Sequence, residues 1–84
     1  MDKNTKILII DDFSTMRQII RNLLNDIGYQ RISEADDGLT ALSLLKAERF
    51  NFVIADYAIP GLQGVELLKA IRNNEKLANI PVLM

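Results

Sequence analysis

The 84-residue chain contains no cysteine and no histidine. Without cysteine it can form no disulfide and offers no thiolate as a metal ligand or nucleophile. Without histidine it lacks imidazole acid–base chemistry and the usual ligands of zinc. Carboxylates are therefore the main candidates for metal binding or covalent chemistry in this sequence.

Excess charge of one sign and long hydrophobic runs are also scarce. Ten basic and eleven acidic residues leave a net charge of −1, which argues against non-specific attraction to nucleic acid. The longest aliphatic run, Ile7–Ile10, is far shorter than a membrane span or the core of a signal peptide. We therefore expect one small cytoplasmic domain with neither a nucleic-acid nor a membrane partner.

Short apolar runs alternate along the chain with segments of helical periodicity. The strand-like segments are Ile7–Ile10, residues 31–35, Phe52–Ala55 and residues 82–84. The helix-like segments are residues 14–27, 39–48 and 65–73. This alternation predicts an α/β fold with a doubly wound parallel sheet and helices on both faces.

The first helix has clear predicted ends and an apolar stripe. Ser14 is a plausible N-cap, and Gly28 lies where a helix would stop. We interpret the stripe as core, and its members are Met16, Ile19, Ile20, Leu23, Leu24 and Ile27. Asp36, Asp37 and Gly38 read as a turn between the second strand and the second helix.

Carboxylates follow two of the predicted strands directly. Asp11 and Asp12 come after Ile7–Ile10, and Asp56 comes after Phe52–Ala55. If these strands are neighbours in a parallel sheet, the three acids converge at one edge. Three close carboxylates resist ionising together unless a cation is present, and Mg²⁺ fits such oxygen ligands better than zinc does. Asp56 is then the natural nucleophile for phosphoryl transfer.

Simpler interpretations remain open for each of these acids taken alone. An Asp pair before a helix is often a turn whose charge favours the positive end of the helix dipole. Asp56 could likewise be a structural turn residue. By themselves, the residues do not decide between a metal site and two acidic turns.

The order of the motifs is more specific than any one of them. The chain reads "ILIIDDFSTMR", "EADDGLTAL", "FVIADYAIPGLQGVELLKAIR" and "IPVLM". In this order they closely resemble the receiver domain of two-component response regulators, over essentially the whole chain. Within that family the chain is most similar to the single-domain receivers that act in chemotaxis. The resemblance implies a flavodoxin-like fold and a phospho-accepting signalling domain rather than an enzyme, although phosphorylation by small phosphodonors is compatible with it.

The resemblance also implies roles for particular residues. Asp11 and Asp12 would bind Mg²⁺, with Asp12 as the more direct ligand, and the backbone carbonyl of Ala58 would complete the protein ligands. Asp56, itself near the metal, would accept the phosphoryl group from the phosphohistidine of a chemotaxis-type histidine kinase. The output partner implied by analogy is the flagellar motor switch protein.

The sequence departs from the family pattern in two respects. Ala58 stands where many close relatives carry Asn, which could alter dephosphorylation, and Tyr57 stands where Trp is common, which is a mild change. The chain also ends within the fourth predicted strand, so residues 1–84 would be a partial receiver domain without the helix, strand and helix that complete it. We therefore expect impaired phosphorylation and output, a partly uncovered first helix, and a homodimer formed through the exposed fourth strand or by strand exchange.

Two other functions remain as alternatives. One is a scaffold or interaction fragment whose acids bind no metal, which Ala58 favours slightly. The other, less favoured, is a Mg²⁺-dependent phosphatase with an aspartyl nucleophile. Such enzymes usually carry Asp-x-Asp after the first strand, whereas here Phe13 follows the Asp pair.

Overall fold

The computed structural model describes residues 2–56 and 64–84 of the chain. Strands and helices alternate throughout this part. The strands are β1 (Ile7–Ile10), β2 (Ile32–Ala35), β3 (Phe52–Ala55) and β4 (Val82–Leu83). The helices are α1 (Ser14–Asp26), α2 (Gly38–Ala47) and α3 (Gly64–Asn73). Each lies within a residue or two of the segment that the sequence predicts, and the predicted α/β fold is confirmed.

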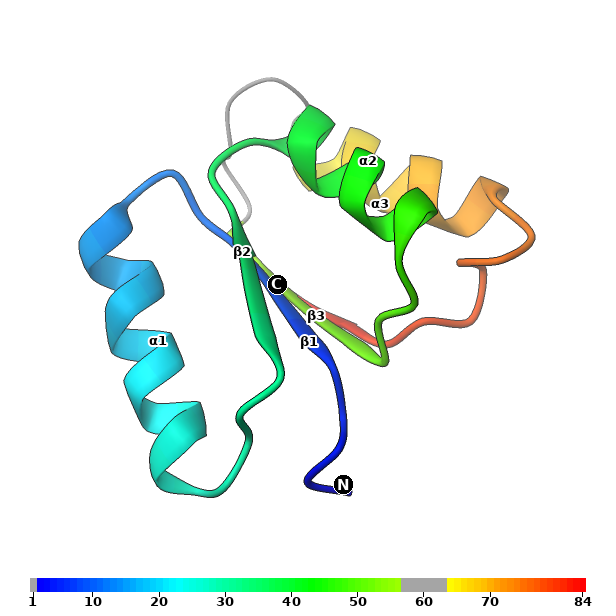
Figure 1. Ribbon diagram of the computed structural model, residues 1–84. Helices are drawn as coiled ribbons and strands as arrows, with labels where there is room; N and C mark the ends of the chain where they lie inside the picture. The colour runs from blue at the N-terminus through cyan, green and yellow to red at the C-terminus, as the bar shows by residue number, and fades with distance from the viewer. Residues whose placement is uncertain (1, 57–63) are drawn as a thin grey trace.

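The strands form one parallel sheet in the order β2-β1-β3-β4. The central strand β1 pairs with β2 on one side and with β3 on the other. Helix α1 covers one face of the sheet, and α2 and α3 cover the other (Figure 1). The doubly wound arrangement is therefore confirmed, and it leaves the carboxyl ends of β1 and β3 side by side.

The main core lies between the sheet and the helices α2 and α3. Successive side chains of a strand point to opposite faces, so Leu8 and Ile10 of β1 face this core while Ile7 and Ile9 face α1. All four are fully buried. The core residues are Leu8, Ile10, Ala35, Ala41, Leu45, Phe50, Val53, Ala55, Leu67, Ile71, Leu77 and Ile80.

Helix α1 packs differently from the other two helices, because none of its residues is buried. The prediction that its whole apolar stripe is core is wrong: Met16 and Ile19 are 45% and 47% exposed, and Leu23 is 61% exposed. Only Ile20 and Leu24 in this stripe are half-buried. The apolar stripe is wider than the part of the helix that contacts the sheet, so its outer side faces solvent. This agrees with the expectation that the helix is partly uncovered.

The ends of α1 are set by the backbone and by Asp11. Ser14 is the first helical residue and not the N-cap; Phe13 occupies that position, and its carbonyl accepts a hydrogen bond from the amide of Arg17 at 3.1 Å. At the other end Gly28 has a positive φ of 103°, a conformation that costs glycine little. The predicted stop at Gly28 is confirmed.

Asp37 is the N-cap of α2. Its carboxylate accepts a hydrogen bond from the amide of Thr40 at 2.7 Å, and this bond, with one from the Thr40 hydroxyl, lowers the pKa of Asp37. Gly38, predicted as part of the turn, is instead the first, buried residue of α2. The acid begins the helix by satisfying one of its free N–H groups.

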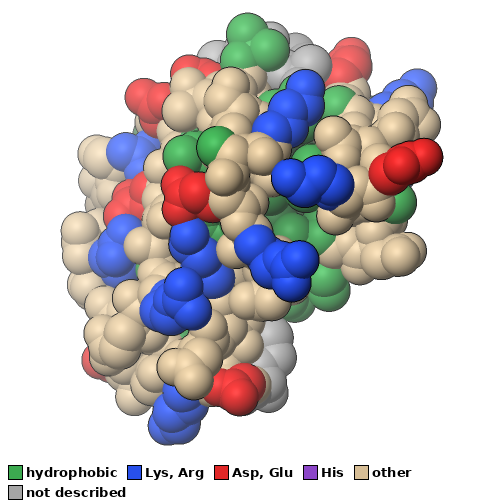
Figure 2. All heavy atoms as spheres, turned by 45° about the vertical axis from the view of Figure 1, so that its right-hand side comes forward, with side chains coloured by type: hydrophobic (Ala, Val, Ile, Leu, Met, Phe, Trp, Pro, Cys, Tyr) green, Lys and Arg blue, Asp and Glu red, His purple; other side chains and the backbone are tan. Residues whose placement is uncertain are grey.

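Basic residues lie at the C-terminal ends of the helices that cover the core. Lys46 is in the last turn of α2 and Arg72 in the last turn of α3, where positive charge complements the helix dipole. Figure 2, which turns this side of the molecule forward, shows Lys and Arg side chains gathered on it. Of the described helices, none combines the length and the hydropathy that a bilayer crossing requires.

The contrast between two leucines of α2 tests the location of the core. Leu45 is 1% exposed and Leu39 is 59% exposed. Replacing a buried leucine by alanine removes packing and leaves a cavity, so Leu45→Ala should lower the free energy of unfolding by about 2–5 kcal/mol. Leu39→Ala deletes the same atoms from an exposed site and should change it by less than about 0.5 kcal/mol. Urea unfolding followed by circular dichroism measures both, and equal losses would contradict this assignment of the core.

Candidate metal centre

The parallel pairing of β1 with β3 places two chain segments of distant sequence at one edge of the sheet. Ile10 pairs with Ala55, so Asp11 and Asp56 leave the two strands at the same level. The amide of Asp56 donates to the carbonyl of Ile10 at 2.9 Å, and the amide of Asp11 donates to the carbonyl of Ala35 at 3.1 Å. Main-chain hydrogen bonds thus continue one residue past the strands and fix the backbone positions of these two acidic residues.

Three carboxylates meet at this edge. Asp11, Asp12 and Asp56 each offer one ligand atom, and these atoms all lie within 4.8 Å of one another. Asp11 is buried, Asp56 is half-buried and Asp12 is exposed. The predicted convergence is confirmed, whereas the roles of the three acids as ligands and acceptor stay predictions. Ala58 and Tyr57 lie outside the described residues.

The donor set suits a hard divalent cation. Carboxylate oxygens are the ligands that Mg²⁺ prefers, and Mg²⁺ commonly takes one or two of them while keeping several waters. Three negative groups this close repel one another, and a divalent cation offsets that repulsion. The residues present therefore fit Mg²⁺, and the exposed Asp12 leaves the group open to solvent on one side.

An open hollow of about 430 Å³ adjoins the carboxylates. Its lining residues come from β1, β3 and the start of α1: Ile10, Asp11, Phe13, Met16, Ile20, Ile54, Ala55 and Asp56. Two of the three acids, Asp11 and Asp56, lie on its wall. The hollow therefore adjoins Asp56, and the rest of its lining is apolar.

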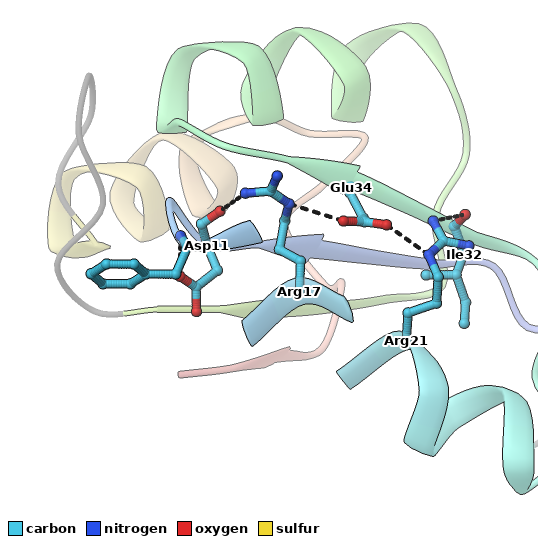
Figure 3. Close-up of polar contacts among 6 residues, drawn as sticks. Asp11, Arg17, Arg21, Ile32 and Glu34 are labelled. Carbon is cyan, nitrogen blue, oxygen red and sulfur yellow. Dashed lines mark hydrogen bonds and ion pairs between the residues drawn. The ribbon is translucent and has the colours of Figure 1, made fainter. Parts of the chain in front are cut away.

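Asp11 is held through its side chain and its main chain. One carboxylate oxygen accepts a hydrogen bond from the amide of Phe13 at 2.9 Å. The carbonyl of Asp11 accepts a hydrogen bond from the guanidinium of Arg17 at 2.5 Å. Figure 3 shows Arg17 reaching from α1 to this carbonyl on one side and to Glu34 on the other.

Two arginines of α1 share Glu34 of β2. Arg17 Nε lies 2.9 Å from one carboxylate oxygen of Glu34, and Arg21 Nε lies 2.6 Å from the other. Arg21 also donates to the carbonyl of Ile32 at 3.1 Å. The network therefore links helix α1, strand β2 and the loop that carries the acidic pair (Figure 3).

This network was not predicted from the sequence, although the sequence carries a signal for it. Arg17 and Arg21 are four residues apart, so they lie on one face of a helix. Glu34 is two residues from Ile32, which the strand prediction places inward, so both side chains point to the same face of β2. A carboxylate on a helix-covered face calls for a cationic partner.

The surroundings of Glu34 set its protonation. Partial burial acts to raise the pKa of Glu34, but the hydrogen bonds and charges of Arg21 and Arg17 outweigh it, so the pKa is lowered from 4.5. Glu34 therefore stays ionised below the pH at which an ordinary glutamate takes up a proton. The ionised form of Glu34, paired with the two arginines, is therefore the form that stabilises the folded chain.

Comparison with protein families gives one match over almost the whole chain. The family described as the response regulator receiver domain matches residues 7–84. The match covers both strands that precede the acids and all of the Arg17–Glu34 network.

Individual relatives agree with this match. The chain is 58% identical to chemotaxis protein CheY-3 of Vibrio cholerae over all 84 residues, which are 65% of that protein. It is 54% identical to chemotaxis protein CheY of Pseudomonas aeruginosa over 79 residues, covering 94% of this chain and 64% of that one. Its structure superposes on chemotaxis response regulator CheY4 of V. cholerae with a TM-score of 0.90 at 34% identity, covering 96% of this chain and 67% of that one. The chain thus spans about 65% of the length of the curated relatives it matches.

The lowered pKa of Glu34 predicts how stability responds to acid. A depressed carboxylate pKa stabilises the fold above the unfolded pKa, and that stabilisation is lost as the pH falls through the folded pKa. The difference in unfolding free energy between wild type and Glu34→Gln should therefore be constant above about pH 5.5 and shrink as the pH falls below the ordinary value of 4.5. Urea unfolding at several pH values measures it, and a difference that grows toward low pH would contradict the pairing.

Proposed function

This chain belongs to the response regulator receiver domain family, and we propose that residues 1–84 form the phospho-accepting part of a two-component phosphorelay. The observation that carries the proposal is the meeting of Asp11, Asp12 and Asp56 at the ends of neighbouring strands, with ligand atoms within 4.8 Å of one another. The family match supplies the signalling context. On this proposal the chain is a signalling phosphoacceptor and not an enzyme that turns over a substrate.

Asp56 is the proposed phosphoryl acceptor. One of its carboxylate oxygens attacks phosphorus, an O–P bond forms, and the N–P bond of the donor phosphohistidine breaks, with the released imidazole taking up a proton. Positioning and charge stabilisation carry most of the catalysis in such transfers. The half-buried position of Asp56 on the wall of the hollow leaves an oxygen accessible to the donor.

Asp11 and Asp12 are the proposed metal ligands, and Asp56 lies close enough to contribute. Mg²⁺ bound there would neutralise charge on the transferring group and lower the mutual repulsion of the carboxylates. Asp12 is exposed and free to turn toward the ion, so we propose it as the more direct ligand, with Asp11 held from behind by Phe13 and Arg17. The backbone carbonyl of Ala58 is the remaining proposed protein ligand.

The proposed partners follow from the named relatives. Both curated relatives are chemotaxis proteins. We therefore propose a chemotaxis-type histidine kinase as the phosphodonor and the flagellar motor switch protein as the output partner, with signalling in the cytoplasm. Both partners concern the whole response regulator, of which these residues cover about 65% of the length in the relatives.

The proposed chemistry predicts phosphorylation at one residue. Incubation of the chain with acetyl phosphate and Mg²⁺ should add the mass of a single phosphoryl group, which intact-mass spectrometry detects. Asp56→Asn should abolish the addition because an amide is a poor nucleophile. Removal of Mg²⁺ with EDTA, or Asp12→Asn, should lower the phosphorylated fraction by about tenfold or more, since the charge on the transferring group is no longer neutralised.

Asp36→Asn is the matched control, because it removes a carboxylate from the turn before α2 that is outside the cluster. It should phosphorylate as wild type does. V. cholerae CheY-3 under the same conditions measures how much of the reaction residues 1–84 support, and we expect a smaller phosphorylated fraction from this chain. Modification that persists in Asp56→Asn would overturn the assigned acceptor, whereas turnover of a phosphate monoester by wild type would favour the phosphatase alternative.

Self-association through β4 is the proposed oligomeric state of the 84-residue chain. Strand β4 lies at one end of the described sheet and pairs only with β3 among the described strands. Its Leu83 is 58% exposed, and Met84, which follows the strand, is 44% exposed. An exposed apolar edge strand is a template for pairing with a second copy, by edge contact or by strand exchange.

A charge on this edge should oppose the association. Sedimentation velocity of the wild-type chain at micromolar concentrations should show a dimer, and Leu83→Lys should shift it toward monomer because a lysine at an edge resists pairing. Leu39→Lys is the control, since it places the same charge at an exposed leucine of α2 far along the chain from β4. A folded monomer of the wild type at every concentration would contradict the proposal.

A further inference from the structure

Arg17 lies between the loop that carries Asp11 and Asp12 and its anchor on the sheet, Glu34. Its side chain is only 17% exposed and donates in two directions. Nε bonds Glu34 at 2.9 Å, and Nη1 bonds the carbonyl of Asp11 at 2.5 Å. The planar, forked guanidinium can hold both partners at once, which a single ammonium group cannot do in the same geometry.

The anchor for Arg17 is rigid because it belongs to a strand of the sheet. Glu34 belongs to β2, where it pairs in register with Ile9 of β1. Its second carboxylate oxygen accepts from Arg21 at 2.6 Å, and Arg21 also bonds the carbonyl of Ile32. The guanidinium of Arg17 is thus fixed relative to the sheet, and not only to its own helix.

Arg17 influences the positions of the acidic residues through the main chain. The carbonyl of Asp11 belongs to the planar peptide group that joins Asp11 to Asp12, so holding this oxygen sets the direction in which the chain continues. The carboxylate of Asp11 accepts from the amide of Phe13, and the carbonyl of Phe13 accepts from the amide of Arg17. Residues 11–13 are therefore bounded by hydrogen bonds that begin and end at Arg17.

We propose that Arg17 is a positioning residue for the carboxylate site: the guanidinium, anchored by Glu34, fixes the loop that carries Asp11 and Asp12 opposite Asp56. The inference rests on the proposed function in so far as the site binds Mg²⁺. Groups behind the ligands commonly set metal affinity, and losing one typically costs about 10–100-fold. Arg17 would act in this way without touching the ion.

If Arg17 acted only through its charge, its loss would change the Mg²⁺ affinity in the opposite direction. A measured affinity therefore distinguishes the two roles. Removing a positive charge near an acidic site strengthens its attraction for a cation. If Arg17 acted only through its charge, Arg17→Met would bind Mg²⁺ more tightly than wild type. A positioning role predicts weaker binding.

Arg21 provides the matched control. It lies one turn further along α1 and pairs with the same carboxylate, but it contacts Ile32 and not Asp11. Arg17→Met and Arg21→Met remove the same charge, and each loses one bond to Glu34 and one bond to a backbone carbonyl, so we expect similar losses of stability. Only Arg17→Met releases the carbonyl of Asp11.

The experiment measures Mg²⁺ affinity by isothermal titration calorimetry on the full 84-residue chain, with circular dichroism as the check of folding. Arg17→Met should raise the dissociation constant about tenfold, and Arg21→Met should leave it within about twofold of wild type. Arg17→Lys keeps the charge but lacks the fork, and it should also weaken binding. It replaces Arg17→Met as the deciding variant if the methionine variant does not fold. Wild-type or tighter binding by the folded Arg17 variant, or an equal loss in Arg21→Met, would overturn the positioning role.

A second readout needs no metal and so separates this inference from the proposed function. The amide proton of Phe13, bonded to the Asp11 carboxylate, is followed by NMR in EDTA. In Arg17→Met its resonance should move upfield toward the position seen in Asp11→Ala, where the bond is absent, and in Arg21→Met it should stay in place. If wild type binds no Mg²⁺, the proposed metal role fails while this resonance still decides the positioning role; an unchanged resonance in Arg17→Met rejects it.

Discussion

The parallel register of β1 between β2 and β3 is the constraint on which the site depends. Ile10 lies opposite both Ala35 and Ala55, so the residues after each strand leave the sheet at one level. Burial of the four aliphatic side chains of β1, worth about 1.5–3 kcal/mol each, stabilises this register. A slip of one residue would turn every side chain of β1 to the other face. The hydrophobic core therefore aligns the acids.

The cost of this alignment is electrostatic. Asp11, Asp12 and Asp56 bring three carboxylates within 4.8 Å, which no requirement of the core explains. The fold offsets part of the repulsion with backbone donors, since the Phe13 amide bonds Asp11, and by leaving Asp12 exposed to water. A divalent cation bound there would relieve the repulsion that remains.

Helix α1 is fixed to the sheet by ion pairs as well as by the apolar contacts of Ile20 and Leu24. None of its residues is buried, whereas α2 and α3 each bury several. Arg17 and Arg21 instead pair with Glu34 on the sheet, with each group partly shielded from solvent. Charged pairs have directional geometry that apolar contacts lack. These ion pairs therefore fix the position of the helix as well as stabilising it. The same network can also orient the loop that precedes the helix.

The sequence by itself determined the order of strands and helices, the parallel sheet and the three acids at strand ends, because hydrophobic period and strand position are local properties. It also predicted the stop of α1 at Gly28. It did not predict that Met16 and Leu23 face solvent, because an apolar stripe does not reveal how much of it a sheet covers. Nor did it predict Phe13 as the N-cap or the ties of Arg17 to Glu34 and Asp11. Those contacts join a helix, a strand and a loop, and only their packing in three dimensions decided which donor met which acceptor.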